Sequence, residues 1–194
     1  MKIVFATGNK GKLKEVKKLF IDTEIEIISL NDLGFEDEIE ETGKTFEENA
    51  FIKADTIYNK YKIPVIADDS GLIVEQLEGR PGVYSARYAG ENATYADNNK
   101  KLLKELKPFP QPHFAKFVCC AVYVDNNNRI VATGELKGEI IKEYKGKNGF
   151  GFDPIFKPLN YAVTLAEMDL SDKNKISHRA KAFKKLKEKI VKIV

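Results

Sequence analysis

The first third of the chain alternates short apolar segments with amphipathic ones, and this alternation restricts the fold more than any other feature. Lys2 to Ala6, Ile25 to Ser29 and Val65 to Ala67 have the apolar content of short buried strands. Between them, apolar residues recur every three to four positions in segments that begin near Leu13 and Thr45, which is the helical period. Strands that alternate with helices pair in parallel, so the sequence predicts an α/β fold.

The rest of the chain is expected to add a helix from Asn98 to Leu106, a run of antiparallel strands and a C-terminal helix. The strands are expected at Phe114 to Val124, Ile130 to Leu136 and Glu139 to Glu143. The last helix should bury Phe183, Leu186, Ile190 and Ile193. Without a repeat or a break in composition, residues 1–194 are predicted to form a single α/β domain, with a twisted mixed sheet flanked by helices and two lobes around a central cleft.

Composition argues against several classes of protein. With 43% hydrophobic and 31% charged residues, the chain has an ordinary globular composition. Its longest apolar runs, such as Val118 to Val124, are far shorter than the roughly 20 residues that cross a bilayer. No signal-type segment precedes Thr7, so we expect a cytoplasmic protein without a membrane partner. A net charge of +3 is lower than nucleic-acid-binding proteins usually carry, so no nucleic-acid partner is expected.

Cysteine and histidine are too sparse for a zinc site. The two cysteines, Cys119 and Cys120, are neighbours in an apolar strand, and we expect buried free thiols. Of the two histidines, His113 lies in a proline-rich loop and is expected at the surface, whereas His178 lies in a cluster of hydrogen-bond donors. Neither has a cysteine or a second histidine at the spacing of metal ligands.

Two polar motifs follow predicted strands. Thr7-Gly8-Asn9-Lys10-Gly11-Lys12 precedes a helix, whose free amides and dipole favour an anion. It is not a Walker loop, because Ala6 and Leu13 replace the required residues. Asp68-Asp69-Ser70-Gly71 follows a buried strand at the edge where α/β sheets bind ligands, and two adjacent acids there favour a metal or cationic partner. The competing interpretations are a plain turn for the first motif and a solvated Asx-turn for the second.

A third motif, Gly149-Phe150-Gly151-Phe152-Asp153-Pro154, places two exposed-looking aromatics between glycines and beside an acid. A nucleobase could stack on such a loop, although packing of both phenylalanines into the core is an equal alternative. The fourth motif, Lys173 to Arg179, supplies donors just before the last helix.

Taken together, six ordered motifs resemble the inosine triphosphate pyrophosphatase family almost from end to end. They are Thr7-Gly8-Asn9-Lys10-Gly11-Lys12, Glu41-Thr42-Gly43-Lys44-Thr45-Phe46 with Glu48-Asn49-Ala50, Ala67-Asp68-Asp69-Ser70-Gly71-Leu72, Pro81-Gly82-Val83-Tyr84-Ser85-Ala86-Arg87, Gly149 to Phe156, and Ser177-His178-Arg179. The resemblance implies a homodimeric enzyme that hydrolyses aberrant purine nucleoside triphosphates (ITP, dITP, XTP) to the monophosphate and pyrophosphate, and so clears them from the nucleotide pool. It also implies a Mg²⁺ cofactor, with Mn²⁺ as an alternative.

The resemblance further assigns residues to roles. Asp69 would bind the metal and activate water, and Glu41 would be the second metal ligand. The substrate contacts it implies are Thr7, Gly8, Asn9, Lys10, Gly11 and Lys12 around the triphosphate, Lys53 and Lys173 on phosphate charge, Ser70 on substrate, Phe150, Gly151 and Phe152 at the purine, and Asp153, His178 and Arg179 at the base edge. Phe152 stands where the family has tyrosine, which keeps a stacking surface without a hydroxyl. Asp68 receives no role beyond holding the turn.

Two other functions remain open. A Maf-like pyrophosphatase would have a similar architecture and another base preference. A non-catalytic protein could instead bind nucleic acid by stacking bases on Phe150 and Phe152, and its affinity would fall steeply with salt.

Overall fold

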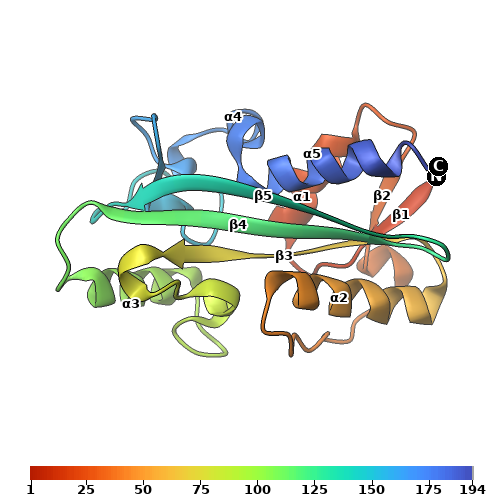
Figure 1. Ribbon diagram of the computed structural model, residues 1–194, viewed down its shortest axis with the longest axis horizontal. Helices are drawn as coiled ribbons and strands as arrows, with labels where there is room; N and C mark the ends of the chain where they lie inside the picture. Colours follow the sequence, from red (N-terminus) through yellow and green to blue (C-terminus); the bar gives the residue numbers. More distant parts are fainter. Residues whose placement is uncertain (194) are drawn as a thin grey trace. The chain divides into compact units, whose positions relative to one another are not determined.

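A computed structural model describes residues 1–193 as one mixed sheet with helices (Figure 1). The sheet has six strands in the order β2-β1-β3-β4-β5-β6. The strands are β1 (Lys2–Phe5), β2 (Glu26–Ser29), β3 (Val65–Val74), β4 (His113–Val124), β5 (Arg129–Ile140) and β6 (Phe156–Pro158). The α-helices are α1 (Lys10–Phe20), α2 (Phe46–Tyr61), α3 (Tyr95–Leu106), α4 (Leu170–Ile176) and α5 (His178–Ile190). Short 3₁₀ turns are Asn31–Leu33, Glu75–Leu77, Gly82–Arg87, Asp153–Ile155 and Leu165–Glu167.

The chain divides into two compact units, and β3, β4 and β5 contribute residues to both. The first unit contains Met1–Asp69, Cys119–Gly134 and the C-terminal segment from His178. The second contains Ser70–Val118 and Glu135–Ser177. Aspartates 68 and 69 are therefore the last β3 residues of the first unit.

The first unit is a parallel α/β layer structure. β1 pairs in parallel with β2 and with β3, with Val4 opposite Val65 in the β1–β3 register. Helices α1 and α5 cover one face of these strands, where Phe5 and Phe183 meet edge-on with ring centroids 5.4 Å apart. Helix α2 covers the other face through its buried alanines and Ile57. The prediction of parallel strands joined by helices is confirmed.

Both helices that follow strands in this unit begin at capped residues. Asn9 caps α1, and its side-chain oxygen accepts hydrogen bonds from the amides of Gly11 (2.9 Å) and Lys12 (3.1 Å). Thr45 caps α2 in a reciprocal capping box with Glu48, as the sequence predicted. The caps fix where each helix starts and hence which side chains face the strands.

The second unit packs α3, the N-terminal end of β4 and the C-terminal end of β5 around another core. β5 pairs antiparallel with β6, with Gly138 opposite Pro158. A side chain at Gly138 would collide with the Phe156 ring, which lies 4.6 Å from the Phe117 ring between centroids. The glycine thus lets β6 close over the aromatic part of this core.

The structure corrects the predicted end of the third strand. β3 does not stop at Ala67 but continues through the two aspartates to Val74. Leu72 and Val74 are fully buried, so the inward-facing pattern resumes beyond Gly71 and keeps the segment extended. Asp68-Asp69-Ser70-Gly71 is therefore not a turn, and this overturns the structural role proposed for Asp68.

Other boundaries also differ. β5 is one strand through Lys137 and Gly138, where the sequence suggested a break before Glu139. Helix α3 begins at Tyr95 rather than Asn98, because Thr94 and Asp97 form a capping box. Helix α5 ends at Ile190, and Ile193 is exposed instead of buried.

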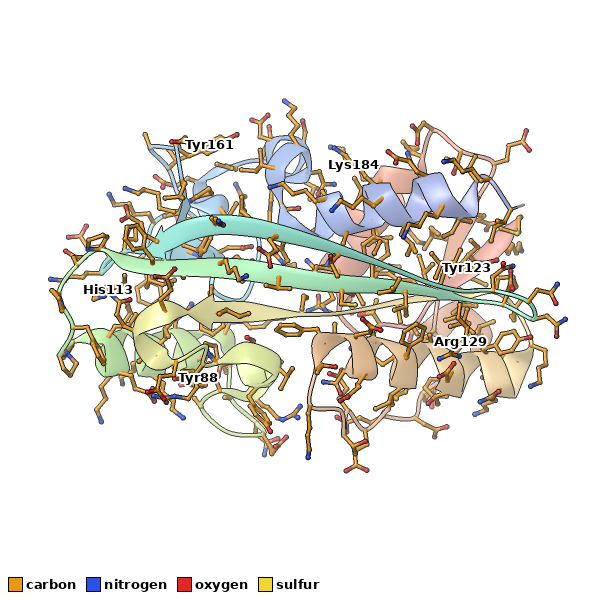
Figure 2. All side chains as sticks on the ribbon, viewed as in Figure 1. Tyr88, His113, Tyr123, Arg129, Tyr161 and Lys184 are labelled. Carbon is orange, nitrogen blue, oxygen red and sulfur yellow. The ribbon has the colours of Figure 1, made fainter. Side chains whose placement is uncertain are left out.

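Two exposure predictions are wrong. His113, labelled in Figure 2, is the first residue of β4 and is buried rather than at the surface. Phe152 is also buried, at 3% exposure, so it is not an exposed aromatic. The prediction of buried free thiols at Cys119 and Cys120 is confirmed. Within residues 1–193, no helix is both long and apolar enough to cross a bilayer.

Candidate active site

The two adjacent aspartates of β3 are both buried, and they face different neighbours. Consecutive side chains of a strand point to opposite faces of a sheet. Asp69 contacts side chains of α2, whereas Asp68 contacts side chains of α1 and α5. One short sequence motif thus builds two distinct polar clusters in the first unit.

The Asp69 cluster contains two carboxylates and one shared ammonium group. The Asn49 side-chain amide donates to Asp69 Oδ2 at 3.1 Å. Lys53 Nζ lies 2.8 Å from Glu41 Oε1 and 3.8 Å from Asp69 Oδ1. Asn49 and Lys53 lie four residues apart in α2, so they share one helix face. The sequence-based prediction included Glu41, Lys53 and Asp69 but omitted Asn49, which the helical spacing to Lys53 could have indicated.

Burial and charge give this cluster unusual proton affinities. Burial raises the pKa of Asp69, and the nearby Glu41 carboxylate adds to the effect, while Lys53 and Lys12 oppose it. Burial acts against the charge on Lys53, but the carboxylates of Asp69 and Glu41 prevail and raise its pKa. The cluster therefore holds a protonated lysine beside a carboxylate that is a stronger base than an ordinary aspartate.

The donors around Lys53 suit a divalent cation bound mainly by substrate. Glu41 and Asp69 already approach one common cation, the Lys53 ammonium. Among residues 1–193 there is no group of three or more His, Cys, Asp or Glu side chains arranged to hold a metal ion. Mg²⁺ is commonly bound by one or two carboxylates together with phosphates and water, so this pair fits it.

The Asp68 cluster is a closed network of charges. Asp68 Oδ2 lies 3.2 Å from Lys12 Nζ and 3.2 Å from Arg179 Nε, and it accepts a hydrogen bond from Cys119 Sγ at 3.6 Å. Arg179 Nη1 donates to Glu15 Oε2 at 2.6 Å. Burial would raise the pKa of Asp68, but the charges of Lys12 and Arg179 hold it well below its usual range. Asp68 is thus an ionised residue with specific partners.

The turn from Thr7 to Lys12 is ordered by its own side chains. Thr7 Oγ1 accepts from the Asn9 amide at 3.2 Å, and Asn9 caps the amides of Gly11 and Lys12. Two of the amides that the sequence offered to phosphate are therefore already bonded. The positive end of α1 and the Lys12 ammonium remain as attractive features for an anion.

In the second unit, the loop from Gly149 to Asp153 is fixed around one carboxylate. Asp153 Oδ2 accepts from the Phe150 amide at 2.9 Å and from Lys173 Nζ at 2.5 Å. Lys173 Nζ lies 4.8 Å from the centroid of the Phe150 ring. Gly149 has a φ of +74°, and a side chain there would strike the Asp153 carboxylate. The loop therefore holds Phe150 in a defined position.

The surroundings of Phe150 suit a flat ligand better than those of Phe152. Phe150 is partly exposed and borders a cavity of about 280 Å³ together with Tyr95, whose ring centroid lies 6.1 Å away. Gly151 is in the same loop, and its carbonyl accepts from Asn99 at 3.0 Å. Phe152 points into the core, so only Phe150 is placed to stack on a base.

The predicted residues thus fall into two sets. The first unit contains Thr7 to Lys12, Glu41, Lys53, Asp69, His178 and Arg179, and the second contains Ser70, Phe150 to Asp153 and Lys173. Lys173, predicted on phosphate charge, lies with the base-side residues Phe150 and Asp153. His178 and Arg179 are buried at the start of α5. This end of the helix lies so close to Gly134 that a side chain on residue 134 would collide with the His178 carbonyl.

A protein-family comparison matches residues 3–189 to the Ham1 family. The chain belongs to the Ham1 family. It is 51% identical to a dITP/XTP pyrophosphatase of Thermoanaerobacter sp. (strain X514), over 99% of this chain and 98% of that protein. The family indicated by the ordered motifs is confirmed.

Solved structures of Ham1 proteins have the same fold. A HAM1 protein from Coxiella burnetii has a TM-score of 0.90 and 41% identity, and covers 99% of both chains. The Ham1 protein of Staphylococcus aureus has a TM-score of 0.88 and 39% identity, and covers 100% of both chains. The expected mixed α/β sheet is therefore that of the Ham1 family.

Proposed function

We propose that this protein hydrolyses noncanonical purine nucleoside triphosphates, such as dITP, ITP and XTP, to the nucleoside monophosphate and pyrophosphate. The observation that carries the proposal is the buried Asp69 carboxylate of raised pKa, held by Asn49 and facing Glu41 across Lys53. Full-length relatives named dITP/XTP pyrophosphatase support the choice of substrate. The cytoplasmic location and the homodimer stay predictions.

Asp69 is the proposed general base. A water oxygen attacks the α-phosphorus, its proton passes to Asp69, and the bond to the bridging oxygen of the leaving pyrophosphate breaks. The raised pKa of Asp69 makes its carboxylate a stronger proton acceptor than an ordinary aspartate. Asn49 orients the carboxylate by donating to its second oxygen.

Glu41 and Asp69 would hold Mg²⁺, with Mn²⁺ as an alternative. When bound, the metal supplies charge stabilisation on the phosphate oxygens. Lys53, which lies between the two carboxylates, would contribute a second positive charge for the phosphate oxygens. Lys12, at the start of α1, adds charge for the triphosphate, and Thr7 to Gly11 and Ser70 line its path.

The base-side residues would select a 6-keto purine. Phe150 offers a stacking face, and Asp153 and Lys173 fix its loop, with Gly151 leaving room beside it. His178 and Arg179 are proposed at the base edge, where donors match the 6-keto oxygen and oppose the amino group of adenine. A site built to hydrogen-bond one group can reject an analogue by about 10⁴-fold.

A panel of nucleoside triphosphates tests the function. With Mg²⁺ and each of ITP, dITP, XTP, GTP, ATP, CTP and UTP, we expect pyrophosphate release from the first three, with kcat/KM for ATP lower by up to about 10⁴-fold. A chelator should stop the reaction, and added Mg²⁺ should restore it. Release of single phosphate, or preference for ATP or a pyrimidine nucleotide, would contradict the proposal and favour a Maf-like or another activity.

A further inference from the structure

Asp68 is a buried carboxylate of the first unit that takes no part in the proposed hydrolysis. The side chains of Asp68 and Asp69 point to opposite faces of the sheet, and the Asp68 side chain is 0% exposed. One of its oxygens, Oδ2, lies within 3.2 Å of both the Lys12 ammonium and the Arg179 guanidinium. Burying a charge at this depth is costly unless the group has specific partners, so these contacts explain why Asp68 can remain ionised.

The same network ties three elements together. Lys12 and Glu15 lie three residues apart on one face of α1, and Arg179 lies in the first turn of α5. Arg179 bonds Glu15 through Nη1 and Asp68 through Nε, so two of its donor nitrogens are engaged within the first unit. Two cations and two carboxylates balance each other in charge.

Lys12 differs from the other three members of the network because its side chain is 15% exposed, whereas theirs are 4% exposed or less. A lysine side chain has four rotatable bonds, and ordering it costs up to about 2 kcal/mol. Because the Asp68 carboxylate holds the Lys12 ammonium at the start of α1, the lysine side chain is already ordered before a ligand binds. Preorganisation of this kind raises affinity without adding a contact to the ligand.

We propose that Asp68 is a positioning residue that acts through Lys12: it holds the ammonium where the substrate's phosphates bind. Asp68 makes no contact with substrate in this scheme, since its carboxylate is buried and would repel phosphate. The inference rests on the proposed function. It also assigns the two aspartates of the motif to different tasks, with Asp69 for the reacting water and Asp68 for the phosphate cation.

A double-mutant cycle distinguishes positioning from simple stabilisation. Asp68→Asn, Lys12→Met and the double variant are compared in the full chain, with calorimetric affinity for inorganic pyrophosphate as one readout and KM and kcat for ITP as the other. Each single variant should lose about ten-fold in pyrophosphate affinity, the size of one charge-assisted contact. The double variant should be no weaker than Lys12→Met alone, because Asp68 acts only through that lysine. Additive losses, or full affinity in Asp68→Asn, would overturn the proposal.

Glu15→Gln is the matched control. It neutralises a buried carboxylate of the same network that bonds Arg179, so it should lower the melting temperature while pyrophosphate affinity stays within about two-fold. If Glu15→Gln weakens pyrophosphate binding as much as Asp68→Asn, the effect belongs to the whole network and the proposal is wrong.

A second variant at position 68 keeps the test usable if Asp68→Asn fails to fold. If Asp68→Asn does not fold, Asp68→Glu replaces it in the cycle, because it keeps the charge but displaces the carboxylate by one methylene. If neither folds, Asp68 is a structural residue and the proposal fails. Because pyrophosphate binding needs no turnover, a wild-type protein that binds it but does not hydrolyse ITP would refute the proposed function alone.

Discussion

Each unit contains a buried lysine–carboxylate pair, and the two pairs differ in how tightly they are closed. In the first unit, Lys53 lies 2.8 Å from Glu41, with side chains 10% and 27% exposed, and also faces Asp69 at 3.8 Å. In the second unit, Lys173 lies 2.5 Å from Asp153, with side chains only 4% and 3% exposed. The first lysine is shared between two carboxylates and is partly open, whereas the second is sealed against Asp153.

The difference in exposure suggests different roles: the Lys53–Glu41 pair can exchange partners, whereas the Lys173–Asp153 pair holds a loop in place. A partly hydrated carboxylate such as Glu41 can accept a metal in place of an ammonium at modest cost. Asp153, in contrast, also accepts from the Phe150 amide, and Lys173 lies over the Phe150 ring. We infer that changes in the open cluster act on chemistry, and that changes in the closed pair act on stability.

The largest effect is expected in the open cluster. Asp69→Asn removes the proposed base and metal ligand while keeping the shape of the side chain, so kcat for ITP should fall by about 10²–10⁴-fold. Steady-state kinetics at saturating Mg²⁺ measure this, with circular dichroism to show an intact fold. The control is Asp55→Asn in α2, whose carboxylate pairs with Arg129 and which should leave kcat unchanged. Comparable turnover by both variants would remove Asp69 from the mechanism.

The closed pair should show the next largest effect, on stability. Lys173→Met leaves the buried Asp153 carboxylate without its ammonium partner, and breaking such a pair costs about 3–5 kcal/mol. Urea unfolding measures the loss, which should exceed that of Lys53→Met because Glu41 can be hydrated. On the same helix, Lys175→Met breaks an exposed pair with Asp172 and should cost less than about 0.5 kcal/mol. An equal loss for Lys53→Met and Lys173→Met would refute the distinction between the pairs.

The smallest effect is expected at Phe150, whose loop is held by the Lys173–Asp153 pair. Phe150→Leu keeps apolar volume but removes the aromatic face, and base stacking is worth about 1–3 kcal/mol. KM for ITP should therefore rise about ten-fold while kcat changes less, because the contact serves ground state and transition state alike. Tyr161→Leu, at an exposed aromatic of the same unit (Figure 2), should leave KM unchanged. A fall in kcat without a change in KM would place Phe150 outside the base site.

The parallel part of the fold follows from local sequence rules. The helical period beginning near Leu13 and the Thr45–Glu48 capping box are determined by residues close in sequence, and the structure has both. The family resemblance likewise assigned roles to Glu41, Lys53 and Asp69, which the structure brings together. Such features need no knowledge of distant contacts.

Other features depend on neighbours that the sequence does not display. Ser70 and Gly71 read locally as a turn, but burial of Leu72 and Val74 keeps β3 extended. The burial of His113 and of Phe152 likewise depends on what packs over them. The partners of Asp68 come from α1 and α5, far away in the chain, so no local pattern could have assigned that residue its network.

Because β3 stays extended through both aspartates, its register against β1 determines which face of the sheet each of their side chains points to. Val4 of β1 lies opposite Val65, and the two carboxylates follow three and four residues later on opposite faces. Deleting one residue between Val65 and Asp68 would turn every later side chain to the other face. Asp69 would then face the cations of α1 and α5, and its neighbour Ser70 would face Lys53. In this strand, the division of labour between two identical side chains is set by whether their distance from the β1 pairing is odd or even.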